Sequence, residues 1–408
     1  MIKNKNIPKL RIPEFKEEGE WEKKRLEDFC QFFLGLTYTP QYVSSGIPFL
    51  SVKDITNGYI SFNNTKYISK EEFNSSTSNA KPQKGDILFG RVGTLGQPIV
   101  VDFDVDFCIF VSLGFIRLGN DVFNYFLKYW MESLFFENQI RRQIAGSSQK
   151  NLNVGWLKKF KINLPSLPEQ TKIADFLSAV DKRIDLLSNK VSQLEEYKKG
   201  AMQKLFSQEV RFKEDNGEEF PEWEKKRLGD LLIKSHIKVG KNSSQYEIVS
   251  STTRGLFNQK DYFNHQVASK NLSNYKIITK GNLVFSPQNL WLGNININED
   301  FDQGIVSPSY KVFKINPVNS TSKYIKYIIK LPYMMCEYDS CSEAGASIVR
   351  RNLNLDLFFN IKCNLPSLPE QTKIANFLSS LDTKIELATK ELNKTEEYKK
   401  GLLQQMFI

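Results

Sequence analysis

The chain has 408 residues, a formal net charge of +10 at pH 7 and a sequence pI of about 9.1. This length fits roughly two or three domains, and the basic balance favours an anionic partner, although a merely basic protein has the same composition. Five cysteines without a CxxC pair, two histidines and no long apolar run exclude a disulfide framework, a zinc site and a membrane span, and indicate a cytoplasmic protein.

The chain opens with a charged strip that recurs after its middle. WEKKRL occupies Trp21 to Leu26 and again Trp223 to Leu228, and we expect both tryptophans to anchor the strip to the protein. A longer segment, from Leu164 to Gly200, recurs from Leu365 to Gly401 at a constant offset of 201 positions. Such a repeat indicates two tandem copies of one unit, each a variable body followed by a long helix.

Each body carries short runs that are typical of β-strands. GDILFGRVG from Gly85 and GNLVFSPQN from Gly281 occupy matching places, as do IFVSLGFIRL from Ile109 and IVSPSYKVFKI from Ile305. Apolar and β-branched runs punctuated by Gly, Asn and Pro predict strands and turns. NYFLKYWMESLFFENQIRRQI and KYIKYIIKLPYMMCEY predict helices, and a strand-like run then leads into LPSLPEQ. Each body is therefore expected to be a compact α+β domain.

The repeated segment predicts the clearest helices of the chain. Pro168 fits the first helical turn, where its missing N–H costs nothing, and Ser166 stands at the N-cap position. Apolar residues recur at spacings of four and three, which is a heptad seam. The seam consists of Ile173, Leu177, Val180, Ile184, Leu187, Val191 and Leu194 in the first copy and of Ile374, Leu378, Leu381, Ile385 and Leu392 in the second. Two such helices favour packing on each other; the alternative is an ordinary amphipathic helix that packs on its own body.

These elements predict an α+β fold of two tandem bodies, joined and separated by two long helices that form an antiparallel, pseudo-two-fold-symmetric coiled coil. The expected boundaries are 1–164 and 208–365 for the bodies and 165–207 and 366–408 for the helices. About 30 coiled-coil residues span about 45 Å, which corresponds to roughly 13 base pairs of DNA. Two-fold-related bodies that far apart fit two half-sites on one side of a duplex.

No catalytic motif is recognisable in the sequence. Gly240 and Lys241 lack the upstream glycine of a phosphate-binding loop, GRVGTLG is not GxGxxG, and NPVN from Asn316 does not match the motif that holds a flipped adenine. His236 and His265 have no suitably spaced Ser or Asp and are interpreted as surface or core residues. We therefore expect a non-catalytic chain with no cofactor or metal of its own.

A glycine-rich turn in the first body carries residues suited to DNA. GRVGTLG presents Arg91 and Thr94, and SPQNLWLG replaces it in the second body with Gln288 and Asn289. Glycine lets a backbone approach a ligand closely, Arg can bond guanine in a bidentate fork, and Gln or Asn can read adenine. The alternatives are a tight turn whose arginine faces water and, for Trp291, either a core residue or a buttress of the loop.

A basic, hydroxyl-rich loop precedes the sequence NLN in each body. Hydroxyls and backbone amides suit phosphate oxygens, while Arg and Gln suit phosphates or base edges. The alternative is a solvated basic loop, which the double occurrence disfavours. The candidate DNA-binding residues here are Arg141, Arg142, Ser147, Ser148, Gln149 and Lys150 in the first body and Ser347, Arg350 and Arg351 in the second, and Arg254 completes the set.

Together these features resemble the specificity (S) subunits of type I restriction–modification enzymes. The resemblance rests on the tandem bodies, on the long helix introduced by LPSLPEQTKIA, on GDILFGRVGT and on GSSQKNLN, and it covers essentially the whole chain. It implies that each body is a target-recognition domain for one half of a split sequence in double-stranded DNA. It also implies that the helices are a spacer and a dock for two DNA-methyltransferase (M) subunits, and that motor–nuclease (R) subunits complete the complex. The methyl donor, ATP and magnesium then belong to those partners.

The second body departs from the first at SPQNLWLG, so the two bodies are expected to read different sequences. A rival hypothesis from another class is a coiled-coil scaffold that joins protein partners and never touches DNA. It predicts that no salt-dependent DNA binding occurs. A stand-alone nuclease or methyltransferase has no support from motifs.

Overall fold

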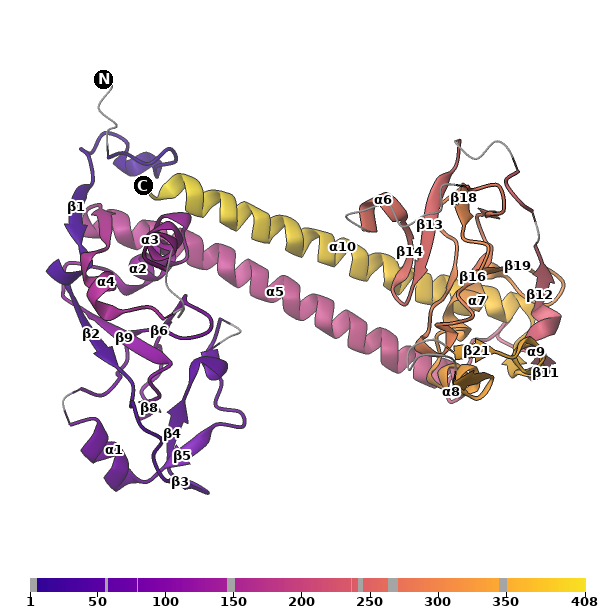
Figure 1. Ribbon diagram of the computed structural model, residues 1–408, viewed down its shortest axis with the longest axis horizontal. Helices are drawn as coiled ribbons and strands as arrows, with labels where there is room; N and C mark the ends of the chain where they lie inside the picture. The colour runs from indigo at the N-terminus through magenta and orange to yellow at the C-terminus, as the bar shows by residue number, and fades with distance from the viewer. Residues whose placement is uncertain are drawn as a thin grey trace. The chain divides into compact units, whose positions relative to one another are not determined.

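The computed structural model describes residues 6–55, 58–78, 80–144, 151–235, 237–240, 245–262, 271–344 and 351–408. The chain forms two compact units, coloured from indigo to yellow along the sequence in Figure 1. The first unit contains residues 1–191 and 387–408, and the second contains residues 192–386. Each unit therefore combines one body, the beginning of the long helix that follows it and the end of the other long helix.

The first body is built from antiparallel sheets with helices packed beside them. One sheet has the strand order β2–β9–β6–β7, a second has the order β3–β5–β4–β8, and β1 pairs with β10. Only the β4–β8 pair is parallel among the described strand pairs of this body. The strands are β1 (Glu22–Arg25), β2 (Cys30–Leu34), β3 (Tyr42–Val43), β4 (Ile47–Leu50), β5 (Lys66–Ile68), β6 (Ile87–Gly90), β7 (Gly96–Val100), β8 (Cys108–Ile109), β9 (Leu113–Leu118) and β10 (Lys161–Leu164). The helices are α1 (Lys70–Ser76), α2 (Asn124–Met131), α3 (Leu134–Ile144) and α4 (Val154–Lys159).

The second body repeats this plan. The sheet β12–β19–β16–β17 matches β2–β9–β6–β7, a second sheet has the order β14–β13–β18–β15, and β11 pairs with β22 as β1 does with β10. The strands are β11 (Glu224–Arg227), β12 (Leu232–Lys234), β13 (Glu247–Thr252), β14 (Gly255–Asn258), β15 (Lys276–Thr279), β16 (Leu283–Phe285), β17 (Ile295–Ile297), β18 (Gln303–Val306), β19 (Lys311–Ile315), β20 (Ser342–Ala344), β21 (Arg351–Leu353) and β22 (Lys362–Leu365). The helices are α6 (Gln259–Tyr262), α7 (Ser322–Ile328), α8 (Pro332–Ser340) and α9 (Leu355–Asn360).

The repeated segment forms the two long helices α5 (Leu167–Phe206) and α10 (Leu368–Met406). Pro168 is the second residue of α5, as its missing N–H requires. Ser166 precedes the helix, but its hydroxyl donates to the Glu18 carboxylate at 3.2 Å. Within the described residues, neither these helices nor any other is long and apolar enough to cross a membrane.

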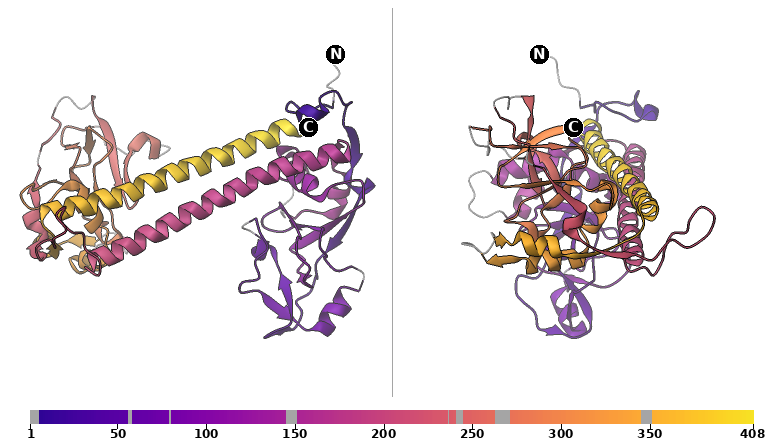
Figure 2. Two further views of the ribbon diagram at one scale, coloured as in Figure 1. Left: turned by 180° about the vertical axis from the view of Figure 1, so that it is seen from behind. Right: turned by 90° about the vertical axis from the view of Figure 1, so that its right-hand side faces the viewer.

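The long helices pair antiparallel within each unit. In the first unit the end of α10 lies beside the beginning of α5 (Figure 2), and Leu403 and Phe407 share a core with Leu177. In the second unit Leu205, near the end of α5, shares a core with Leu378. The same cores contain residues of the bodies, so each helix packs on its body as well as on the other helix. Two α+β bodies with paired long helices are the fold class that the sequence predicted.

Seam residues differ in burial along each helix. Ile173, Leu177, Val180, Leu187, Ile374, Leu378 and Leu381 are at most 8% exposed. Ile184, Val191, Leu194, Ile385 and Leu392 are half-buried. The beginnings of the helices are thus the best covered, because each lies against both its body and the other helix.

Candidate nucleic-acid interface

The glycine-rich turn of the first body connects β6 to β7. A Cβ atom at Gly90 would lie 2.1 Å from the carbonyl oxygen of Thr94, so only glycine permits this turn. Thr94 itself is exposed. Gln97, which sequence reasoning did not single out, has a left-handed φ of 34°. Its Oε1 atom is buried without a hydrogen-bond partner among the described residues.

Arg91 fixes the turn to two neighbouring stretches of chain. Its Nε donates to the Leu152 carbonyl at 3.3 Å, and its Nη1 donates to the Val111 carbonyl at 3.1 Å. The side chain is half-buried, and this burial lowers the pKa of Arg91. The arginine does not simply face water, because part of its hydrogen-bonding capacity holds the turn in place.

In each unit the turn meets the chain at or directly before the NLN sequence, which lies far along the chain. The Leu152 N–H donates to the Arg91 carbonyl at 2.8 Å, beside an antiparallel bridge between Val92 and Asn151. In the second unit the Arg351 N–H donates to the Gln288 carbonyl at 3.1 Å. The two candidate segments that the sequence indicated separately are therefore one surface region in each body.

The second body presents different chemistry at this place. Gln288 is exposed, whereas Asn289 is half-buried and its Oδ1 has no partner among the described residues. The Arg351 guanidinium lies 4.4 Å from the centre of the Trp291 ring and forms an ion pair with Asp339. Trp291 thus supports the loop through Arg351, because a cation over an aromatic face is attracted by the ring.

Arg254 lies on another exposed element of the second body, the turn between β13 and β14. Its guanidinium is 5.8 Å from the Phe257 ring centre and 5.7 Å from that of Tyr262. Tyr262 is exposed and Phe257 is half-buried. A cation beside aromatic rings suits both phosphates and unstacked bases.

The remaining candidates lie at the end of α3 or beyond the described residues. Arg141 is exposed and pairs with Glu137 one turn earlier, at 2.6 Å, and Arg142 is exposed. The other candidates and both histidines lie outside the described residues: Ser147, Ser148, Gln149, Lys150, His236, His265, Ser347 and Arg350. Among the described residues there is no group of three His, Cys, Asp or Glu that could hold a metal ion.

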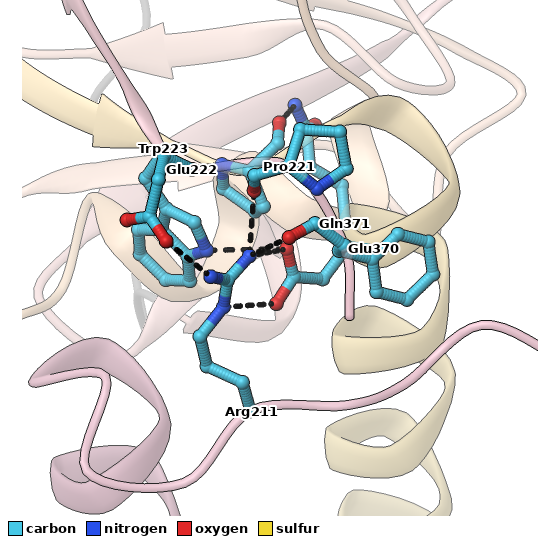
Figure 3. A network of polar contacts seen from close by, with 8 residues as sticks. Arg211, Pro221, Glu222, Trp223, Glu370 and Gln371 are labelled. Atoms are coloured by element: carbon cyan, nitrogen blue, oxygen red, sulfur yellow. Dashed lines mark hydrogen bonds and ion pairs between the residues drawn. The ribbon is translucent and has the colours of Figure 1, made fainter. Parts of the chain in front are cut away.

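A buried ion pair, which sequence reasoning missed, stands at the beginning of each long helix. Glu370 is fully buried, and Figure 3 shows the Arg211 guanidinium bonding both of its oxygens, at 3.2 and 3.0 Å. Trp223 Nε1 also donates to Glu370, at 3.2 Å, which is how this tryptophan anchors its strip. In the first unit Arg11 bonds both oxygens of Glu169 at 2.8 Å. The carboxylate raises the pKa of each arginine through these hydrogen bonds.

The glutamine that follows each of these glutamates ties the helix to its body. Gln170 accepts from the Phe123 N–H at 2.9 Å and donates to the Pro165 carbonyl at 3.0 Å. Gln371 accepts from the Ser320 hydroxyl at 2.7 Å and donates to the Pro366 carbonyl at 3.0 Å. The Glu and Gln of LPSLPEQ are thus buried polar residues that connect the helix start to the body. The exact repetition of this sequence was the signal from which their role could have been predicted.

A second polar cluster lies about three turns further along each helix. Asp181 accepts from Lys128 at 3.0 Å, from Tyr129 at 2.8 Å and from Lys399 of the other helix at 2.6 Å. Burial opposes ionisation of Asp181, but the two lysines outweigh it and hold its pKa below the ordinary value.

The second unit repeats this cluster with Asp382 in the place of Asp181. Asp382 accepts from Tyr327 at 2.8 Å, from Lys198 at 2.5 Å and from Lys326 at 3.3 Å. Burial again opposes ionisation, and Lys198 contributes most to keeping the Asp382 pKa low. Each body is therefore joined to both long helices through one aspartate.

The comparisons with known proteins agree with this architecture. The model of the type I restriction modification DNA specificity domain matches the chain twice, at residues 18–196 and 221–397. A putative type I restriction enzyme MjaX specificity subunit from Methanocaldococcus jannaschii is 26% identical over 98% of this chain and 95% of its own length. The type I restriction enzyme MjaVIII specificity subunit of the same organism is 24% identical over 98% and 93%.

Solved structures share the fold. The S subunit of a type I restriction–modification system from M. genitalium aligns with a TM-score of 0.60 at 17% identity and covers 98% of this chain and 99% of its own. A chain from a study of complex assembly and conformational transition of the type I R-M system aligns with a TM-score of 0.53 at 15% identity, covering 95% and 97%.

The two matches to the family model cover most of the sequence, and the chain belongs to the family of type I restriction modification DNA specificity domains. It is a DNA-target-recognition chain of a type I restriction–modification system and not an enzyme in its own right.

Proposed function

We propose that this chain recognises a bipartite DNA target, with one body for each half-site. The observation that carries the proposal is the contrast between the two bodies at one structurally equivalent place. The turn after β6 carries Arg91 and Thr94, while the turn after β16 carries Gln288 and Asn289. Arginine matches guanine and the carboxamides match adenine, so one plan with two different surfaces suits two different half-sites.

Positive charge supplies the sequence-independent part of the affinity. The chain carries a formal net charge of +10, and its exposed cations include Arg142 at the end of α3 and Arg254 between β13 and β14. Phosphate contacts by such residues release counterions, so binding should weaken steeply as salt rises. Further contacts to phosphates or bases are proposed for Arg141, Lys150, Arg350, Ser147, Ser148, Gln149 and Ser347. Arg351 is proposed to support the turn beside them.

Partners supply the chemistry in this proposal. The paired helices α5 and α10 serve as a spacer between half-sites and as the dock for two methyltransferase subunits, and motor–nuclease subunits join to form the restricting complex in the cytoplasm. The motor and methyl-transfer chemistry, with its cofactors, resides in those subunits. The four segments 1–164, 165–207, 208–365 and 366–408 are the functional divisions of the chain in this scheme.

Selection from a random duplex library by the chain in complex with its methyltransferase partners tests the proposal. The expected result is a split sequence, with two short defined elements separated by a fixed undefined stretch. Mobility shifts at physiological salt should then show at least 10³-fold preference for that sequence, the low end of specific DNA binders. Equal affinity for selected and random duplexes would favour a scaffold that does not read DNA.

Substitution of Arg91 separates base contact from phosphate contact. Arg91→Met, which removes the cation, should cost about 1–3 kcal/mol on targets that carry the preferred half-site of the first body and leave discrimination at the other half-site intact. A uniform loss on all sequences would make Arg91 a phosphate contact instead. Lys158→Met, which removes a cation from α4 of the same body, is the matched control.

A further inference from the structure

The buried arginines lie where the end of one long helix meets the beginning of the other. In the first unit the Leu10 N–H donates to the Gln405 carbonyl of α10 at 2.9 Å, while Arg11 binds Glu169 at the beginning of α5. In the second unit the Val210 N–H donates to the Lys204 carbonyl of α5 at 3.2 Å, while Arg211 binds Glu370 at the beginning of α10. We call Leu10, Arg11, Glu169 and Gln405 the first clasp, and Val210, Arg211, Glu370 and Lys204 the second clasp.

The two clasps have the same contacts, but the segments that connect each arginine to its tryptophan differ in length and structure. The segment between Arg211 and Trp223 is two residues longer than that between Arg11 and Trp21. It contains a bridge between Lys213 and Glu219, whereas the shorter segment contains a single 3-10 turn, Pro13–Phe15. The intervening structure has therefore changed while its end points have not.

Each arginine binds the same two main-chain carbonyls, counted from the tryptophan. Arg11 donates to Glu18 and Gly19, three and two residues before Trp21, at 2.7 and 3.0 Å. Arg211 donates to Phe220 and Pro221, three and two residues before Trp223, at 3.1 and 2.6 Å. Each guanidinium thus joins three segments: its own, the strip that leads into the first strand of the body, and the first turn of a long helix. Figure 3 shows this arrangement for Arg211.

Stability alone is a poor explanation for this arrangement. The side chains of Glu169 and Glu370 are 0% exposed, and those of Arg11 and Arg211 are 5% and 14% exposed. Desolvating such a pair offsets much of its attraction, and packed apolar residues of the same volume are often as stable or more so. What the pair provides is a fixed geometry, because a planar fork meets a carboxylate in one orientation.

We propose that Arg11 and Arg211 are positioning residues that set the angle between each recognition body and the paired long helices of its own unit. The inference rests on the proposed function, since the orientation of the bodies is measured through the distance between the two half-sites in the DNA. With both clasps closed, each body has one orientation and the complex accepts one spacing. With a clasp open, the strip detaches from the helix start, and neighbouring spacings become accessible at about 3.4 Å for each base pair.

The test repeats the library selection with clasp variants of the full chain in complex with its methyltransferase partners. Arg11→Met combined with Glu169→Leu removes both charges and leaves no buried ion unpaired, and Arg211→Met with Glu370→Leu does the same in the second unit. Arg11→Lys keeps the charge and loses the fork, so it tests geometry with the smallest change to the core. Lys16→Met, which removes an exposed cation from the first strip, is the control.

The expected result is a spacing distribution that broadens from one value to at least two adjacent values in each clasp variant, with both half-site sequences unchanged. Hydrogen exchange at the end of α10 should accelerate at least tenfold in the Arg11 variants and stay unchanged in Lys16→Met. Clasp variants that fold and select the wild-type spacing with the same sharpness overturn the inference and leave the proposed function intact. A wild-type complex that selects no split sequence overturns both.

Discussion

Phe407, the second-last residue of the chain, should stabilise the first unit and not the second. Its side chain is 1% exposed, and its ring centre lies 5.4 Å from that of Phe126 in α2. The adjacent Ile408 carbonyl accepts from Asn163 at 2.9 Å, which closes the end of the chain onto the first body. Replacing the Phe407 side chain by alanine therefore tests whether the end of the second repeat belongs to the core of the first body.

The magnitude follows from the burial. Removing a buried phenylalanine side chain costs about 3–5 kcal/mol, and we expect about 3 kcal/mol for Phe407→Ala. That corresponds to a roughly 140-fold increase in the open population of the first unit. Leu387→Ala is the control, because Leu387 lies on α10, the helix that ends just before Phe407, and is 62% exposed. It should change stability by less than about 0.5 kcal/mol.

Hydrogen exchange followed by mass spectrometry is the suitable assay, because it reports each unit separately. Phe407→Ala should accelerate exchange in β6, β9 and α2 and leave β16, β19 and α7 unchanged. Acceleration in the second body, or exchange in the first body within twofold of wild type, would refute the assignment of the α10 end to the first core.

Further predictions concern the buried ion pairs and the thiols. Arg211→Met should destabilise the second unit by about 3–5 kcal/mol, as measured by chemical denaturation, because it leaves Glu370 buried without its partner, and adding Glu370→Leu should recover most of this loss. The Asp181 pKa lies below its unfolded value of 3.8, so the stability that Asp181 contributes is present above that pH and is lost as pH falls through the folded pKa. In a calorimetric series over acidic pH, the melting temperature of Asp181→Asn should therefore fall less steeply than that of the wild type. An identical fall in both proteins would contradict a stabilising ion pair at Asp181. Among the five cysteines only Cys336 is exposed, and burial raises the pKa of Cys108 to about 11, so the native protein should react with one equivalent of an aromatic disulfide reagent at pH 8 and with all five after unfolding.

Local and repeated features of this fold were predictable from the sequence. The helices α5 (Leu167–Phe206) and α10 (Leu368–Met406) were recognisable as helices, because proline, heptad spacing and exact repetition all point to the same start. The stretch expected to be helical after β9 is two helices, α2 and α3, separated at Glu132 and Ser133. In the second body Pro332 enforces the same break, since it can occupy only the first turn of α8.

Long-range polar contacts were not predictable from one sequence. Arg11 and Glu169 are 158 residues apart, and the arginines do not follow the 201-residue offset of the helices, so nothing local marks them as partners. The sharing of helix ends between units was hidden for another reason. Leu205 and Leu402 continue an amphipathic pattern whichever surface they cover, because periodicity reveals a buried face but not its neighbour.

The segments of the candidate interface were recognisable from the sequence, but the contact between them was not. Arg91 and the NLN sequence were recognisable as two separate polar segments, and the fold brings them together through the main-chain bond between Leu152 and Arg91. The restraint of the Arg91 side chain by carbonyls was not predictable, because a hydrogen bond to a backbone oxygen leaves no trace in residue type.

A map of adenine methylation in the host genome tests the central claim most directly. We expect a split motif, with two short defined elements at a fixed distance, that is fully modified in the wild type and unmodified when this gene is deleted. Replacing residues 208–365 with the second body of another family member should change one element of the motif and preserve the other. A methylation pattern that is the same with and without the gene would contradict the claim that this chain selects the DNA target.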